Sequence, residues 1–224
     1  MCGIAGYAGS RKASEILLGI IKGTEKLEER PGGGAGIATI YRARLNVRKD
    51  AGFVEEVERK AKLSEIKGSI GIAHNRSYPK TSEASKTNAH PHLDCKGEIA
   101  VVHAGNIDNF QEIQKQLGKE GHKLISKIDT AVIPHVIEKY YKNNLAEAVK
   151  RAARDFKGEY AFLALSKKEP NKIVGIMKGR PLAVGKGEGF CIFSSDAASI
   201  KNAEVKELNN EIVVITKTKV QHAD

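Results

Sequence analysis

Apolar positions along the first half of the chain follow two different periods. Runs that are apolar throughout predict short buried strands, and segments in which apolar residues recur every three or four positions predict amphipathic helices. The Gly/Pro-rich stretch Arg30–Gly36 marks a break between such elements. In chain order the pattern predicts a strand at Cys2–Ala8, a helix through Ile16–Leu27, a hairpin of Gly36–Tyr41 and Arg44–Lys49, a charged helix at Phe53–Leu63, and strands at Ser69–His74 and Glu98–His103.

The second half begins with helical periodicity and ends with β-rich runs. Helices are predicted at Asp129–Lys142 and Leu145–Phe156, the first opening on a short polar side chain suited to capping. From Glu159 onward, successive apolar runs separated by Gly, Pro, Asn and Lys predict an antiparallel meander. Strands at both ends with helices between and beside them favour an α+β fold in which helices enclose two sheets. We expect residues 1–224 to form one domain.

Composition narrows the class of protein. Apolar residues make up 41% of the chain and charged residues 29%, which is typical of an ordered globule. The sequence shows neither a secretory signal nor an apolar stretch of membrane-spanning length, so we expect a cytoplasmic protein without membrane contact. A net charge of +10 raises nucleic acid as a partner, but the lysines are interspersed with glutamates and aromatic residues are only 5%, which argues against it.

The chain opens MCGIAGY, with a cysteine directly behind the initiator methionine. If Met1 is removed, Cys2 carries both a thiol and a free α-amine, which can serve as the base for its own nucleophile. The alternative is that Cys2 is a small buried apolar side chain. Cys95 and Cys191 lie far from it and form no CxxC pair, so the sequence predicts reduced thiols.

A polar loop after the strand at Ser69–His74 contains the next candidates. Arg76 stands at the strand end, where a guanidinium can bind a carboxylate through two hydrogen bonds, although a surface ion pair is the alternative. His90 and His92 resemble metal ligands, but no further ligand has a suitable spacing. We therefore predict neither a metal nor a cofactor.

Two further positions admit a functional and a structural interpretation. Gly105 follows a buried strand and could offer its backbone amide to a developing oxyanion, or could simply form a strand-to-helix turn. Asp129 could pair with a substrate ammonium group or cap the helix that it opens.

In this order the segments resemble the class II glutamine amidotransferases, most closely the glutaminase domain of the glutamine–fructose-6-phosphate aminotransferases. The resemblance implies an N-terminal nucleophile hydrolase fold, a four-layer α/β/β/α sandwich. It also implies that Cys2 attacks L-glutamine, that the Gly105 amide joins the oxyanion hole, and that Arg76 and Asp129 bind the α-carboxylate and α-ammonium groups, with His90 also on the substrate side. The motifs that carry the resemblance are MCGIAGY, AGIA (35–38), GIAHNR (71–76), NAHPH (88–92), VVHAGNIDN (101–109), DT (129–130), GEYAFLAL (158–165), RPLAVGKGEG (180–189) and SSD (194–196).

Three departures from the family pattern accompany this resemblance. The family's HNG is His103-Ala104-Gly105 here, so the side-chain amide of the oxyanion hole is missing. The family's TRWATHG corresponds to residues 75–81, which keep Arg76 but lack the tryptophan, threonine and histidine that line and close the glutamine pocket. RGYDSAG is replaced by Arg30–Gly36.

The resemblance and its departures give one leading hypothesis and two alternatives. The sequence shows no isomerase or synthase domain, so the leading expectation is a glutaminase subunit that passes ammonia to a separate synthase partner, within a homo-oligomer or as a monomer. One alternative is a degenerate domain that binds glutamine or a partner with little turnover. The other is the glutaminase subunit of a glutamate synthase-like complex.

Overall fold

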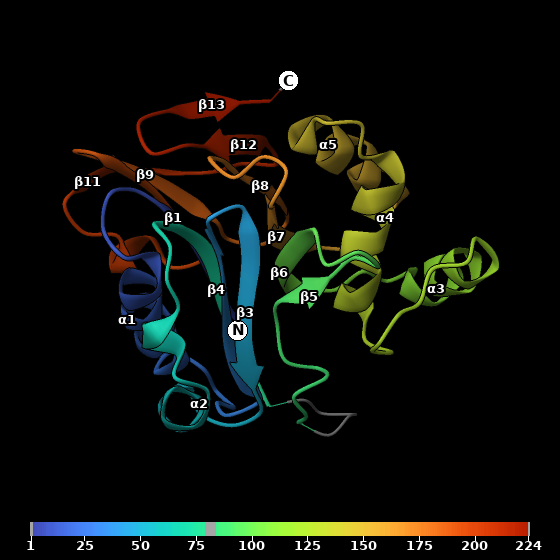
Figure 1. Ribbon diagram of the computed structural model, residues 1–224, viewed down its shortest axis with the longest axis horizontal. Helices are drawn as coiled ribbons and strands as arrows, with labels where there is room; N and C mark the ends of the chain where they lie inside the picture. Colours follow the sequence, from blue (N-terminus) through green and yellow to red (C-terminus); the bar gives the residue numbers. More distant parts are fainter. Residues whose placement is uncertain (1, 79–83, 224) are drawn as a thin grey trace.

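Figure 1 shows the computed structural model, which describes residues 2–78 and 84–223. Two antiparallel β-sheets lie face to face at its centre. The first sheet contains, in spatial order, β11 (Ala203–Glu207), β9 (Ala183–Gly187), β10 (Phe190–Ser194), β1 (Gly3–Ala8), β4 (Ile70–Arg76), β2 (Gly34–Tyr41) and β3 (Arg44–Asp50). The second contains β13 (Val220–His222), β12 (Ile212–Ile215), β8 (Ile173–Lys178), β7 (Tyr160–Ser166), β6 (Ile99–Gly105) and β5 (His92–Leu93).

Helices cover the outer face of each sheet, so the layer order is the predicted α/β/β/α (Figure 1). The first sheet is covered by α1 (Ala13–Glu25) and α2 (Val54–Ala61), and the second by α3 (Phe110–Lys119), α4 (Val132–Tyr140) and α5 (Leu145–Asp155). Short 3-10 turns occur at η1 (Leu63–Glu65), η2 (Asp129–Ala131) and η3 (Ala197–Ser199). No helix in the described residues has the length and apolar character needed to cross a membrane.

The apolar core is divided by the sheets into three layers, and strand β6 shows how. Ala100, Val102 and Ala104 belong to the cluster between the two sheets, whereas Ile99 and Val101 pack against the helices that cover the second sheet. Successive side chains of a strand point to opposite faces, so both faces of β6 are buried. Each fully buried Val or Ile contributes about 1.5–3 kcal/mol to stability.

The elements predicted for the first half of the chain are confirmed, with shifted ends. The predicted hairpin is present as β2 and β3, which pair from Ala35 opposite Asp50 to Tyr41 opposite Arg44. Strand β4 continues past the predicted end at His74 to Arg76. The extension matters because it places Arg76 at the last position of a buried strand.

The strands predicted for the last third are present and pair antiparallel, but the single meander predicted for them is wrong. Strand β8 pairs with β7 and β12 in the second sheet, whereas β9 pairs with β10 and β11 in the first. The chain crosses between the sheets after Lys178, where Gly179 adopts φ +69°. Because β8 and the first half of β9 are both buried along successive residues, their apolar pattern does not distinguish a return within one sheet from a crossing to the other.

Candidate active site

Cys2 lies immediately before β1 and is half-buried against the core between the sheets. The backbone amide of Ser77 donates a hydrogen bond to its Sγ at 3.4 Å. Since β1 pairs with β4 from Gly3 opposite Asn75, the end of β4 is held beside the cysteine. Met1 lies outside the described residues, so its predicted removal stays a prediction.

The Arg30–Gly36 segment, which departs from the family pattern, fixes the chain that follows β4. Gly33 donates its amide to the carbonyl of Arg76 at 3.0 Å, and Tyr78 donates to the carbonyl of Arg30 at 2.5 Å. A Cβ atom on Gly33 would lie 2.2 Å from the carbonyl oxygen of Ser77, so a side chain there would force the two segments apart. Residues 79–81 of the predicted pocket loop lie outside the described residues.

Ser77 is held by a hydrogen bond to a buried carboxylate, that of Glu28. Glu28 is 8% exposed, and it accepts a short hydrogen bond from Ser77 Oγ and a longer one, 3.5 Å, from Asn75 Nδ2. Thr24 Oγ1 in turn donates to Asn75 Oδ1 at 2.5 Å. The sequence analysis missed Glu28 because it stands in the charged run EKLEER, which is typical of a solvated surface.

Arg76 lies close enough to Cys2 and to Asp129 for the charges of both to act on it. Burial lowers the pKa of Arg76, and the charges of Cys2 and Asp129 act in the opposite direction. Its Nη1 is buried and has no hydrogen-bond partner among the described residues. Such a donor is costly to leave unpaired, so the position is suited to binding an anion that comes from outside the chain.

Asp129 is held by backbone amides from two segments. Its Oδ2 accepts from the amide of Ile107 at 3.1 Å, and its Oδ1 accepts from the amide of Thr130 at 2.8 Å. Neither amide belongs to the first turn of α4, and the N-cap residue of α4 makes no side-chain cap hydrogen bond. The predicted capping of this helix by Asp129 is therefore not seen. These contacts join η2 to the segment after β6, and the ammonium-binding role of Asp129 stays a prediction.

Gly105 ends β6 in a conformation that favours glycine. Its φ is +116°, and a Cβ atom would lie 2.2 Å from the carbonyl oxygen of Glu159. The neighbouring Ala104 is 3% exposed and faces the cluster between the sheets, against which Cys2 also packs. The two positions assigned to the oxyanion hole therefore stand at the end of a rigid strand on the cysteine side of the sandwich.

His90 is buried next to His74 of β4 and His103 of β6. It is 3% exposed, its ring stacks on that of His74 at 3.9 Å, and its Nδ1 accepts the backbone amide of His103 at 3.3 Å. Burial lowers the pKa of both stacked histidines well below the usual value, so both rings are neutral at pH 7. This burial favours a supporting role for His90 over direct contact with substrate.

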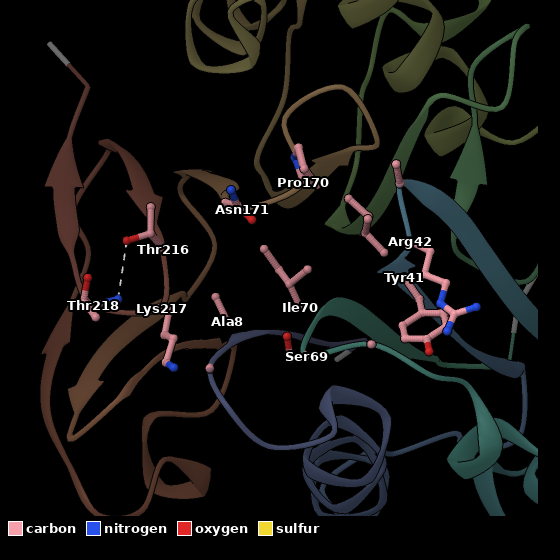
Figure 2. A pocket seen from close by; sticks show the side chains of 14 residues that line it. Ala8, Tyr41, Arg42, Ser69, Ile70, Pro170, Asn171, Thr216, Lys217 and Thr218 are labelled. Carbon is pink, nitrogen blue, oxygen red and sulfur yellow. Dashed lines mark hydrogen bonds between the residues drawn. The ribbon is translucent and has the colours of Figure 1, made fainter.

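A large cleft in the described structure lies away from Cys2. Figure 2 shows it at the Ala8 end of β1, with a volume of about 580 Å³ and walls from Tyr41, Arg42 and Pro170. Six residues of extended chain separate Cys2 from Ala8, a span of about 20 Å. The cleft is thus separate from the cysteine.

Comparisons with known proteins identify relatives of this chain. A family model described as a glutamine amidotransferase domain matches residues 74–202. Glutamine–fructose-6-phosphate aminotransferase (isomerizing) from Clostridium tetani is 39% identical over 228 residues, covering 100% of this chain and 37% of the relative. The enzyme of the same name from Pyrococcus horikoshii is 40% identical over 198 residues, covering 88% of this chain and 32% of the relative. The chain spans about a third of the length of these relatives.

Solved structures show the same fold. Glutamine phosphoribosylpyrophosphate amidotransferase from B. subtilis superimposes with a TM-score of 0.84 at 25% identity, covering 99% of this chain and 49% of that one. A glutamine aminotransferase class-II domain protein from Silicibacter pomeroyi gives a TM-score of 0.67 at 13% identity, with 100% and 99% covered. The chain therefore belongs to the class II glutamine amidotransferase domain family, and its sandwich is the N-terminal nucleophile hydrolase fold.

Proposed function

We propose that this domain hydrolyses L-glutamine to L-glutamate and ammonia through a thioester on Cys2. The observation that carries the proposal is the Arg76 guanidinium, which feels the charges of both Cys2 and Asp129 and whose buried Nη1 is unpartnered among the described residues. A glutamine molecule supplies what these groups lack. Its α-carboxylate pairs with Arg76, its α-ammonium with Asp129, and its side-chain amide then reaches toward Cys2.

The chemistry takes place in two steps. With Met1 removed, the α-amine of Cys2 takes the thiol proton, and the thiolate attacks the side-chain carbonyl carbon of glutamine. The Gly105 amide stabilises the resulting oxyanion. The C–N bond breaks as the α-ammonium returns its proton to the leaving ammonia, which leaves a thioester. Water then attacks the thioester, the C–S bond breaks, and glutamate and the free thiol are released.

The ammonia is proposed to pass to a synthase. Ammonia released into water is protonated and ceases to be a nucleophile, so a glutaminase of this kind needs an acceptor site close by. The curated relatives are named for a reaction with fructose 6-phosphate, which favours a sugar phosphate as the acceptor. A synthase module or subunit that holds this acceptor is the proposed partner.

One observation favours a second candidate function. Ala104 offers no side-chain donor where the family has an asparagine amide, and loss of one such donor typically costs about 10²–10³ in rate. A domain with so weakened an oxyanion hole could bind glutamine or a protein partner with little turnover.

The two functions are separated by Cys2→Ala, with Cys191→Ala as the matched thiol control because Cys191 is fully buried in β10. Glutamate release and labelling by a diazo-ketone glutamine analogue should be lost in Cys2→Ala and kept in Cys191→Ala. Intact mass of the native protein should show that the chain begins at Cys2.

Two results would decide against the enzyme. Equal labelling of Cys2→Ala would remove the nucleophile. Glutamine binding without turnover in the wild type, with and without a synthase partner captured from source cells, would establish the binding module instead.

A further inference from the structure

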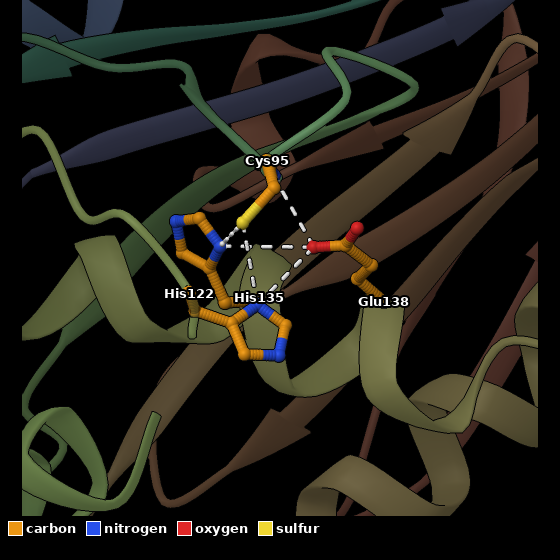
Figure 3. A group of neighbouring side chains, drawn as sticks. All are labelled: Cys95, His122, His135 and Glu138. Carbon is orange, nitrogen blue, oxygen red and sulfur yellow. Dashed lines mark hydrogen bonds and ion pairs between the residues drawn. The ribbon is translucent and has the colours of Figure 1, made fainter. Parts of the chain in front are cut away.

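Four side chains with metal-ligating atoms meet on one side of the second sheet. Figure 3 shows Cys95, His122, His135 and Glu138 pointing toward a common centre. Their ligand atoms all lie within 4.8 Å of one another. Cys95 Sγ is 3.3 Å from His122 Nδ1 and 3.2 Å from His135 Nδ1, and Glu138 Oε2 is 3.4 Å and 3.8 Å from the same two nitrogens.

Three separate segments contribute to this cluster. Cys95 lies in the turn between β5 and β6, His122 follows the end of α3, and His135 and Glu138 stand one turn apart on α4. Because residues three apart on a helix share a face, α4 presents both side chains in the same direction. Sequence patterns do not predict this site, since the spacing of 27 and 13 residues between its first three members matches no short ligand motif.

The separations match a tetrahedral ion of a particular size. Zinc binds sulfur at about 2.3 Å and nitrogen or oxygen at about 2.0–2.2 Å, so neighbouring ligand atoms of a tetrahedral site lie about 3.3–3.6 Å apart. The four separations between sulfur or oxygen and the two Nδ1 atoms, 3.2–3.8 Å, fall around that range. One thiolate, two imidazoles and one carboxylate also form a borderline-soft ligand set, which suits Zn²⁺ better than Mg²⁺ or Ca²⁺.

The surroundings hold the cluster in place. Lys96 Nζ lies 3.6 Å from Glu138 Oε1, which leaves Oε2 for the centre, and the amide of Cys95 donates to Oε2 at 3.2 Å. Outer contacts of this kind orient metal ligands in known sites.

We propose that Cys95, His122, His135 and Glu138 bind one Zn²⁺ ion in a closed structural site. With four protein ligands the ion has no open position for water or substrate. The ion connects the β5–β6 turn to His122, just after α3, and to α4. Asp129 lies in the chain between these two attachment points, so the metal restricts the motion of the predicted ammonium site without taking part in the reaction.

The test measures metal on the untagged full chain. Purified protein loaded with Zn²⁺ and then desalted should retain one zinc per chain by elemental analysis, and Co²⁺ in its place should give a thiolate-to-cobalt charge-transfer band. His122→Ala should lose at least ten-fold in zinc affinity, and Cys95→Ser should lose the charge-transfer band. His222→Ala is the matched control, because His222 also pairs with a glutamate, Glu211, but has no thiol beside it.

Thermal unfolding gives a second readout that needs no glutamine turnover. At a free Zn²⁺ concentration about 100 times Kd, the wild type and His222→Ala should melt about 5–10 °C higher than without metal, and His122→Ala should not shift. Wild-type protein that retains no zinc and shows no shift would overturn the proposal. So would a His122→Ala variant that binds zinc as the wild type does, or a wild type that takes up Cu⁺ and rejects Zn²⁺.

Discussion

Ala104→Asn tests the oxyanion hole directly, because it returns a side-chain donor beside the Gly105 amide. Ala104 is 3% exposed and its side chain points into the cluster against which Cys2 packs. An asparagine there adds three heavy atoms and one amide group to that cluster. We expect a lower reaction barrier and a less stable protein at the same time.

The expected changes in rate and in stability follow from the burial of Ala104. A preorganised oxyanion donor contributes about 3–4 kcal/mol, and a donor added without its supporting contacts should contribute about 1–3 kcal/mol, a rise in kcat of about 5- to 150-fold. Overpacking and the partly unpaired amide each cost about 1–3 kcal/mol of folding free energy. KM should change little, because the ground-state carbonyl needs the donor less than the oxyanion does.

Two control variants separate these effects. Ala104→Leu has nearly the same added volume and no donor, so it should lose stability without gaining kcat. Ala100→Asn places the same amide on the same face of β6, where Ala100 is fully buried far from Gly105. Steady-state glutaminase kinetics and urea unfolding give the readouts. An unchanged kcat in a folded, glutamine-binding Ala104→Asn would refute the assignment of this position to the oxyanion hole.

Three further predictions concern substrate binding, the buried carboxylate and pH. Arg76→Ala and Asp129→Ala should each raise KM for glutamine by about 10- to 100-fold with a smaller change in kcat, measured alongside thermal stability; an unchanged KM would return both residues to structural roles. Glu28→Leu should destabilise the fold by about 2–4 kcal/mol in urea unfolding because Ser77 Oγ loses its acceptor, whereas Glu28→Gln should cost less; equal losses would contradict this. Burial lowers the pKa of His92 to about 3, so its imidazole stays neutral in the folded chain but takes up a proton in the unfolded chain. The free energy of unfolding should therefore fall by about 1.4 kcal/mol per pH unit from this residue as the pH drops below about 6.5. Urea unfolding at pH 7.5 and pH 5 measures that slope, and His92→Gln should reduce it.

The sequence was sufficient for the layers of the fold and for the strands next to Cys2, Arg76 and Gly105, although β4 and β6 each run two residues beyond their predicted ends. Apolar periodicity and the motif order are local properties, and they translate directly into strands and helices. The partners of Glu28 and the zinc ligands could not be predicted in the same way. Their hydrogen bonds join residues 27 to 49 positions apart, so they exist only once the chain has folded.

The close approach of Gly33 to Ser77 makes two departures from the family pattern a single structural unit. A tryptophan grafted at Ser77 alone would leave Glu28 without its hydroxyl donor, and a side chain at Gly33 alone would strike the carbonyl of Ser77. Converting the pocket toward the family form therefore requires residues 30–36 and 75–81 to be exchanged together. Single exchanges should each be harmful, and the combined exchange should cost less than their sum.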